Sequence, residues 1–298
     1  MRHTLKQWIL VTRPWSFPAA TMPVLVAFSF AFHQYKNNII SDINCIDAIL
    51  AFLGAMFFQA AGNLISDYYD FINNVDRKES FGSNRMVIDG IFEAKTVLKY
   101  GLILLLVGCI IGIYLCFQSG IYLLFIGLAG VVGTLFYYKL KYRALGDFLI
   151  FLIFGLMIGL GSYYVITRIL SYEILFVSVP LGLLITAILH ANNTRDMIHD
   201  KQIGIKTSAI LLGIKGAKIK YALLLILSYV IVIILIMMKI VPYSCLSVLL
   251  TLPLAIRNII QMSKFSDKSP EIIMSLDSKT AQLVLAFAIL FSISNFVF

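Results

Sequence analysis

The most informative segment of the sequence runs from residue 63 to residue 89 and reads NLISDYYDFINNVDRKESFGSNRMVID. A shorter counterpart covers residues 192–207 and reads NNTRDMIHDKQIGIKT. Each segment begins at the end of a long apolar run with an Asn-x-x-x-Asp element, and the two elements lie 129 residues apart. The repetition predicts two apolar helices that end in the same kind of polar, acidic surface.

Within each segment the polar side chains recur at helical spacing. Asn63, Asp67 and Asp70 stand at positions i, i+4 and i+7, which predicts that they share one face of a helix. The second segment predicts another such face, with the positions i, i+4 and i+8 taken by Asn192, Asp196 and Asp200.

The composition places these helices in a membrane. The chain has 298 residues, of which 60% are hydrophobic and 13% charged, and its mean hydropathy is +0.92. Soluble domains carry roughly 25% charged residues, so the sequence predicts an all-α integral membrane protein. No hydrophilic stretch is long enough for a soluble domain. We therefore expect one membrane-embedded domain over residues 1–298, with pseudo-repeated halves of roughly 1–140 and 141–298.

Nine apolar runs are long enough to cross a bilayer, which takes about 20 residues of helix. They are residues 15–33, 45–66, 97–117, 120–138, 147–167, 173–193, 218–238, 242–260 and 280–298. The pattern predicts about nine transmembrane helices around a central cavity. The polar connection 67–96 is expected to contain a short helix and to cap that cavity. Segment 203–216 is too short to span, and we expect it at the membrane interface.

Basic residues set the predicted orientation. The chain has a net charge of +9, and 21 of its 24 lysines and arginines fall on one side of the predicted spans, together with both acidic motifs. The positive-inside rule makes this side cytoplasmic. The sequence thus predicts a multi-pass protein of the cell (inner) membrane with a cytoplasmic N-terminus, an external C-terminus and a site that faces the cytoplasm. This charge distribution argues for the lipid bilayer, and not a nucleic acid, as the partner, and says nothing about protein partners.

The acidic residues need an explanation, because a carboxylate inside a membrane is costly unless it pairs, binds an ion or faces water. One alternative is that they are solvated residues at helix ends, paired with neighbouring Lys or Arg. Two clusters on the same side, each preceded by an asparagine, argue instead for a shared ligand. Mg²⁺ prefers oxygen ligands and combines one or two carboxylates with phosphate oxygens. One diphosphate with a metal ion on each side would fit between Asp67, Asp70 and Asp76 and the pair Asp196 and Asp200.

Basic and aromatic residues near the same face complete the candidate site. Arg85, in the turn FGSNRM, and Arg195 lie inside the acidic motifs, and the planar fork of arginine suits phosphate oxygens. Lys139 is a further candidate, although the positive-inside rule alone would also explain it. Tyr138 is explained equally by an aromatic belt at the interface and by a ring that shields a carbocation.

Five blocks of sequence carry a resemblance to a known family: TRPWSFPAATMPVLVA at 12–27, NLISDYYD with Asp76 at 63–76, GSNR at 82–85, YYKLKYRALGD at 137–147 and NNTRDMIHDKQIGIKT at 192–207. With these blocks the sequence resembles the UbiA-type superfamily of membrane-embedded prenyltransferases. Within it the match looks closest to the 1,4-dihydroxy-2-naphthoate polyprenyltransferases of menaquinone biosynthesis. Ser66, where many relatives have Asn, and Asp147, where this branch usually has Glu, depart from the pattern.

The resemblance implies a UbiA-type bundle, Mg²⁺ as cofactor, a polyprenyl diphosphate donor and an aromatic acceptor. It implies electrophilic aromatic prenylation, with loss of CO₂ when the acceptor is a naphthoate. The expected catalytic residues are Asp67, Asp70, Asp196, Asp200 and Arg85, and the expected metal ligands are these four aspartates with Asp76. The expected substrate-binding residues are Asn63, Arg85, Lys139, Tyr138, Asn192, Asn193 and Arg195.

Two other functions fit parts of the pattern. Another phenolic or quinol acceptor would use the same mechanism. A cation-coupled transporter would also have paired motifs in two halves, but its site would lie near the bilayer midplane, whereas these carboxylates are predicted at the cytoplasmic edge. A lipid-head-group phosphotransferase is disfavoured because its expected DGxxAR and DxxxGxxxDxxxD patterns are absent from the sequence.

Overall fold

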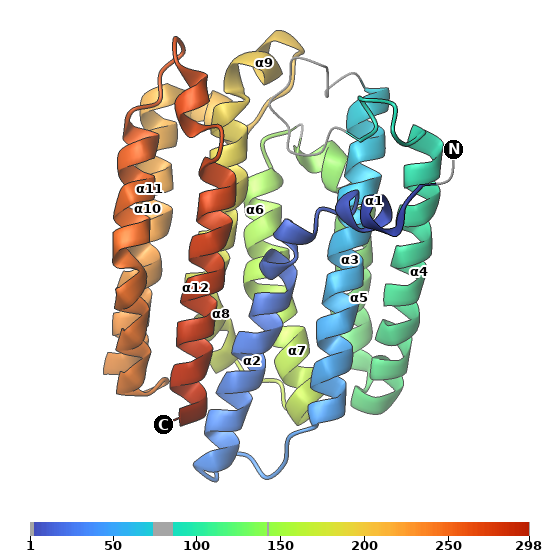
Figure 1. Cartoon of the computed structure of the whole chain (residues 1–298). Helices are drawn as coiled ribbons and strands as arrows, with labels where there is room; N and C mark the ends of the chain where they lie inside the picture. The colour runs from blue at the N-terminus through green and yellow to red at the C-terminus, as the bar shows by residue number, and fades with distance from the viewer. Residues whose placement is uncertain (1–2, 74–85, 142, 298) are drawn as a thin grey trace.

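The computed structural model describes residues 3–73, 86–141 and 143–297. In these residues the protein is a bundle of helices, with a single isolated bridge, between Arg143 and Lys206, as its only strand-like pairing. The long helices run side by side along one axis, and the short helix α1 lies across one end of the bundle (Figure 1). The predicted all-α class is confirmed.

The first half of the chain forms one side of the bundle. Its elements are α1 (Leu5–Leu10), η1 (Pro14–Ser16), α2 (Pro18–Lys36), α3 (Cys45–Ile72), α4 (Ala94–Ser119) and α5 (Ile121–Lys141). The second half consists of α6 (Gly146–Ile150), the π-helical turn η2 (Phe151–Met157), α7 (Ile158–Thr167), α8 (Glu173–Arg195), α9 (Met197–Gln202), α10 (Ser208–Met237), η3 (Tyr243–Thr251), α11 (Leu252–Ser263), η4 (Pro270–Ile273) and α12 (Leu276–Val297).

The predicted spans agree with the helices. Among the described residues, eight helices are long and apolar enough to cross a membrane. A ninth span is counted if α1 with η1 and α2, which meet at a bend of 60°, are taken together. Each of the predicted runs falls on one of these elements. The division into pseudo-repeated halves stays a prediction.

Helix α8 lies at the centre of the packing. It is the most buried of the candidate spans, and it packs against α2, α10, α12 and η2. The largest apolar cluster joins these elements and includes Leu181, Leu184 and Phe287. The least buried spans are α4 and α5, which form the outer side of the bundle.

Two glycines let α8 approach η2 closely. A Cβ atom added at Gly182 would lie 2.5 Å from the Cα of Gly155, and one added at Gly155 would lie 2.9 Å from the Cα of Gly182. Small residues at such crossings let helix backbones meet without lipid between them. The contact therefore fixes the position of η2 against the central helix.

Replacing Gly182 by alanine is expected to destabilise the bundle by about 1–3 kcal/mol, because the new methyl group would overlap a backbone that cannot move aside. Thermal unfolding in detergent measures the effect. The matched control is Gly112→Ala on α4, where an added Cβ meets nothing within 4 Å. If the two variants unfold at the same temperature, the close approach of α8 and η2 does not support the fold.

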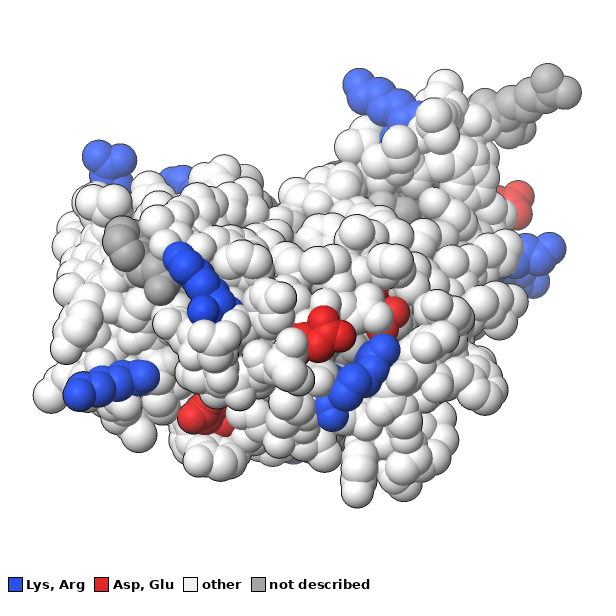
Figure 2. Space-filling model, turned by 90° about the horizontal axis from the view of Figure 1, so that it is seen from below, with Lys and Arg blue, Asp and Glu red and all other residues white. Residues whose placement is uncertain are grey.

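Both acidic motifs lie at the same end of the bundle, where α3 and α8 end and the N-terminal helix crosses (Figure 1). The opposite end, seen in Figure 2, shows few charged side chains. Its ion pair joins Arg168 to the buried carboxylate of Asp47. The structure thus separates a charged end from a mostly uncharged end, as the distribution of Lys and Arg in the sequence predicts.

Two local predictions need correction. The second motif does not form one continuous helix, because Asp196 (φ −90°, ψ 1°) ends α8 and precedes α9. Segment 203–216 is not one separate element: its latter part belongs to α10, whose helical geometry is interrupted at Gly213 (φ +66°). This positive φ suits glycine because it has no Cβ atom. The predicted short helix in the 67–96 connection falls largely on residues 74–85, outside the described residues.

Candidate active site

A cavity of about 360 Å³ opens between the two motifs. Its lining side chains come from both halves of the chain. The polar and charged ones are Arg13, Ser16, Gln59, Asn63, Ser66, Asp70, Thr134, Tyr137, Asn192, Asp277 and Ser278. The apolar lining includes Ala19, Ala55, Phe58, Gly127, Gly130, Ile153, Phe154, Ile185 and Ile188.

The cavity is polar at one end and apolar below it. On α3 the lining runs from Ala55 and Phe58 to Asn63 and Asp70, toward the end of the helix that carries the motif. The other lining helices show the same order, with their polar residues at the motif end of the bundle. Because an α-helix rises 1.5 Å per residue, these positions form a polar mouth over a deeper apolar pocket.

The two carboxylates of the first motif lie in different environments. Asp70 lines the cavity, is buried, and accepts a hydrogen bond from Ser66 Oγ at 3.2 Å. Asp67 is buried beside the cavity and forms an ion pair with Arg13. The predicted helix face is confirmed, since Asn63, Asp67 and Asp70 all lie on α3.

Asn63 attaches the N-terminal segment to α3. Its Nδ2 donates to the backbone oxygen of Thr12 at 2.9 Å and to Ser16 Oγ at 2.8 Å. Gln59, one turn earlier on the same helix, donates to Ser16 Oγ at 3.1 Å. In this structure Asn63 therefore positions the segment that carries Arg13, and its expected role in substrate binding stays a prediction.

The second motif is organised by Arg195. Its guanidinium donates to both carboxylate oxygens of Asp196 at 2.8 Å and to Asp277 Oδ2, on α12, at 2.9 Å. It also donates to Asn192 Oδ1. Arg195 is thus paired with protein carboxylates here, and Asn192 and Asp277 are the members of this group that line the cavity.

Other predicted residues lie around the cavity without lining it. Asp200 is buried in the first turn of α9. Tyr138 stacks on Tyr69 with ring centroids 3.9 Å apart, and Lys139 is exposed with its Nζ 5.8 Å from the centroid of the Tyr138 ring. The neighbouring Tyr137 is the tyrosine of this helix that faces the cavity. Arg85 and Asp76 lie outside the described residues.

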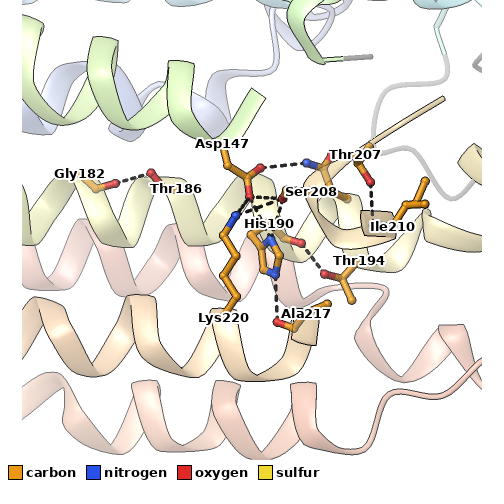
Figure 3. Close-up of polar contacts among 11 residues, drawn as sticks. Asp147, Gly182, Thr186, His190, Thr194, Thr207, Ser208, Ile210, Ala217 and Lys220 are labelled. Carbon is orange, nitrogen blue, oxygen red and sulfur yellow. Dashed lines mark hydrogen bonds and ion pairs between the residues drawn. The ribbon is translucent and has the colours of Figure 1, made fainter. Parts of the chain in front are cut away.

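Asn193 belongs to a separate buried cluster around Asp147, whose members His190, Ser208 and Lys220 are seen in Figure 3. The Oδ2 atom of Asp147 contacts Ser208 Oγ at 2.5 Å, Lys220 Nζ at 2.6 Å and His190 Nδ1 at 3.0 Å. Its Oδ1 accepts from Asn193 Nδ2 at 3.2 Å. The cluster ties α6 to α8 and α10, so the predicted substrate-binding role of Asn193 has a structural alternative.

Sequence reasoning missed Arg13, Gln59, Ser16 and Asp277. Arg13 lies in the block TRPW, where the sequence alone identifies it only as one more positive charge on the predicted inner side. Gln59 stands four residues before Asn63, so helical spacing would have placed it on the face of the motif. Ser16 and Asp277 stand at no spacing that links them to the motifs. Only the folded bundle brings them to the polar mouth.

Comparison with known proteins decides the family. The model of the UbiA prenyltransferase family matches residues 20–276. The chain belongs to this family. UbiA prenyltransferase domain-containing protein 1 of Rattus norvegicus is 36% identical over 240 residues, which cover 77% of this chain and 68% of the rat protein. The prediction of a prenyltransferase of the UbiA superfamily is confirmed, and the narrower assignment to the naphthoate branch stays a prediction.

Solved structures of UbiA proteins share the fold. The apo structure of a UbiA homolog from Aeropyrum pernix K1 has a TM-score of 0.67 at 16% identity, over 97% of this chain and 98% of that chain. A UbiA homolog from Archaeoglobus fulgidus, bound to GPP and Mg²⁺, has a TM-score of 0.60 at 17% identity, over 96% and 99% of the two chains. The UbiA-type bundle is therefore the architecture of this protein.

Proposed function

We propose that this UbiA-family enzyme transfers a polyprenyl group from a polyprenyl diphosphate to an aromatic acceptor. The observation that carries the proposal is the cavity, which is polar where the two motifs meet and apolar below. A prenyl diphosphate has the same division, with a charged head and a long hydrocarbon tail. The Archaeoglobus fulgidus relative, bound to GPP and Mg²⁺, supports this class of donor.

The donor atoms at and beside the polar end of the cavity fit Mg²⁺. Asp67 and Asp70 offer carboxylate oxygens, the hard ligands that this ion prefers, and Mg²⁺ usually needs only one or two carboxylates beside substrate phosphates and water. Within residues 3–73, 86–141 and 143–297, no three His, Cys, Asp or Glu side chains group closely enough to hold a metal by themselves. We therefore propose that Asp67, Asp70 and Asp76 bind one Mg²⁺ together with the diphosphate, and that Asp196 and Asp200 bind a second.

In the proposed reaction the bond between the allylic carbon and the diphosphate oxygen breaks and pyrophosphate leaves. An electron-rich ring carbon of the acceptor takes the prenyl group and gives up a proton or, in a naphthoate, its carboxylate as CO₂. Bound Mg²⁺ would neutralise charge on the departing pyrophosphate. Arg85, Arg195 and Lys139 would add positive charge at the same place. Below them the apolar walls from η2 and α8 would hold the tail and keep water away from the allylic cation.

For the acceptor we propose 1,4-dihydroxy-2-naphthoate, so that the ring carbon that gains the prenyl group loses its carboxylate as CO₂ and the quinol form of demethylmenaquinone results. The resemblance of the five sequence blocks to the naphthoate branch supports this choice, and Trp15, Phe58 and Tyr137 place aromatic side chains in the lining of the cavity. Another phenol or quinol is the alternative, because the polar mouth does not depend on which ring is bound.

The test is a membrane-fraction assay with labelled farnesyl or longer prenyl diphosphate, Mg²⁺ and 1,4-dihydroxy-2-naphthoate. We expect a prenylated, decarboxylated product that disappears on addition of EDTA and in the Asp67→Ala, Asp196→Ala double variant. A product formed only with a different phenol would change the identity of the acceptor and leave the proposed mechanism in place. No transfer to any aromatic acceptor, combined with metal-dependent uptake into vesicles, would contradict the proposal in favour of a transporter.

We also propose that the motif end of the bundle faces the cytoplasm of the cell membrane, because most of the Lys and Arg residues lie at that end. Single cysteines placed at the exposed positions Asp267 and Asn37, in a variant without the four native cysteines, test this orientation. In intact cells a membrane-impermeant maleimide should label position 37 and spare position 267. The reverse pattern would invert the proposed topology.

A further inference from the structure

We propose that Arg13 is a substrate-binding residue that covers Asp67 as in this structure and moves to an oxyanion of the substrate when Mg²⁺ takes Asp67. This inference rests on the proposed function, since it needs Mg²⁺ at the first motif. It adds an N-terminal arginine to a site that the sequence motifs placed entirely on later segments.

The position of Arg13 is the first observation. Arg13 lines the cavity, whereas Asp67 does not. The carboxylate of Asp67 is only 4% exposed, while the Arg13 side chain is 23% exposed and paired with it. Arg13 therefore stands between Asp67 and the cavity, and a cation that enters from the cavity reaches Asp67 only after the guanidinium has shifted.

The pairing leaves Arg13 incompletely satisfied. Its Nη2 donates to Asp67 Oδ1, but its buried Nε has no hydrogen-bond acceptor among the described residues. A buried donor without a partner costs about 1–3 kcal/mol. A second arrangement that gives Nε an acceptor would remove this cost, and the planar fork of arginine binds phosphate and carboxylate oxygens through two donors at once.

The backbone at Arg13 is also strained. Arg13 has φ 56° and ψ 60°, the left-handed region, and precedes Pro14. A non-glycine residue in this region costs about 1 kcal/mol or more and persists only where the surroundings hold it. Here the surroundings are Asn63 and Gln59, whose side chains bind Thr12 and Ser16 on either side of Arg13.

These contacts connect the arginine to the motif. Ser16 Oγ accepts from Asn63 and donates to the backbone oxygen of Arg13 at 2.9 Å. In the Asn-x-x-x-Asp element of α3, Asn63 thus holds the backbone around Arg13, and Asp67 pairs with the Arg13 side chain. These hydrogen bonds fix the backbone of Arg13. The long side chain can still change partner, from Asp67 to a substrate oxygen in the cavity.

The exchange predicts opposite effects on two ligands, which a supporting role in the fold would not produce. In purified full-length protein, calorimetric titration with Mg²⁺ alone should show about five-fold tighter binding in Arg13→Gln, because the guanidinium no longer competes for Asp67. Titration with inorganic pyrophosphate in saturating Mg²⁺ should show about ten-fold weaker binding, since a charge-assisted donor is lost. Arg13→Lys keeps the charge without the fork, and we expect weaker pyrophosphate binding with Mg²⁺ binding close to wild type.

The control is Arg257→Gln, which removes the same charge from an exposed position on α11 and should change neither affinity. If Arg13→Gln weakens Mg²⁺ binding or leaves it unchanged, the exchange is contradicted. A third titration, with 1,4-dihydroxy-2-naphthoate, identifies the oxyanion: weaker binding of this ligand with unchanged pyrophosphate binding would assign Arg13 to the acceptor carboxylate. If both ligands bind Arg13→Gln as they bind wild type, Arg13 contacts no substrate.

Failure of the proposed function looks different from failure of this inference. Wild-type protein that binds neither Mg²⁺ nor pyrophosphate with Mg²⁺ would contradict the proposed metal site itself. Wild-type protein that binds both, with an Arg13→Gln variant indistinguishable from it, would contradict only the role of Arg13.

Discussion

Replacing Asp70 by asparagine is expected to lower kcat/KM for prenyl transfer by about 10³-fold, the size of effect seen when one group that stabilises developing charge is removed. Asp70 is buried, lines the cavity and accepts from Ser66. Asparagine has nearly the same shape, so the packing of α3 should survive. What is lost is the negative charge that would hold Mg²⁺ against the diphosphate.

The measurement is the transfer assay over a series of Mg²⁺ concentrations, with unfolding temperature recorded for each variant. Asp267→Asn is the matched control, because Asp267 is exposed in the loop after α11 and should leave the rate unchanged. We expect the Mg²⁺ concentration for half-maximal activity to rise in Asp70→Asn. Activity within ten-fold of wild type would show that Asp70 is not a metal ligand.

Replacing Asp147 by alanine is expected to cost about 3–5 kcal/mol of stability, as when one partner of a buried ion pair is removed. The carboxylate is 5% exposed. Its donors are His190 and Asn193 on α8 and Ser208 and Lys220 on α10. Figure 3 shows His190, Ser208 and Lys220 around the carboxylate. Without the carboxylate, a charged amine and several buried donors lose their common acceptor, and α6 loses its attachment to α8 and α10.

Thermal unfolding in detergent, with the exposed Asp267→Ala as control, measures the loss. Asp147→Asn should fall between the wild type and Asp147→Ala, because it keeps one acceptor oxygen. A loss below about 1 kcal/mol for Asp147→Ala, the range of an ordinary exposed pair, would show that the remaining donors find other partners.

The spans could be predicted because a helix that crosses a bilayer needs a long apolar run with its polar residues at the ends. The position of both motifs at one end follows from the same pattern. The sequence also predicts that Asn63, Asp67 and Asp70 share a face, since a helix that ends at Ile72 contains all three.

The rest depends on contacts between distant segments. The break at Asp196 goes with an arginine that pairs with Asp277, 82 positions further along the chain, and no local spacing reveals such a pair. Arg13 reaches Asp67 only because the N-terminal segment folds across the end of α3. Asn193 neighbours Asn192 in the motif, yet it turns to Asp147 while Asn192 faces the cavity.

The exposure of α5 has a consequence for engineering. One side of this helix gives the cavity a wall of Gly127 and Gly130, where an added Cβ meets nothing within 4 Å. The other side presents Phe125, Leu128 and Val132, each more than half exposed. A library that varies residues 127 and 130 could therefore shorten the space for the donor tail step by step, without disturbing the packing around α8, which makes α5 the natural helix on which to redesign chain-length preference.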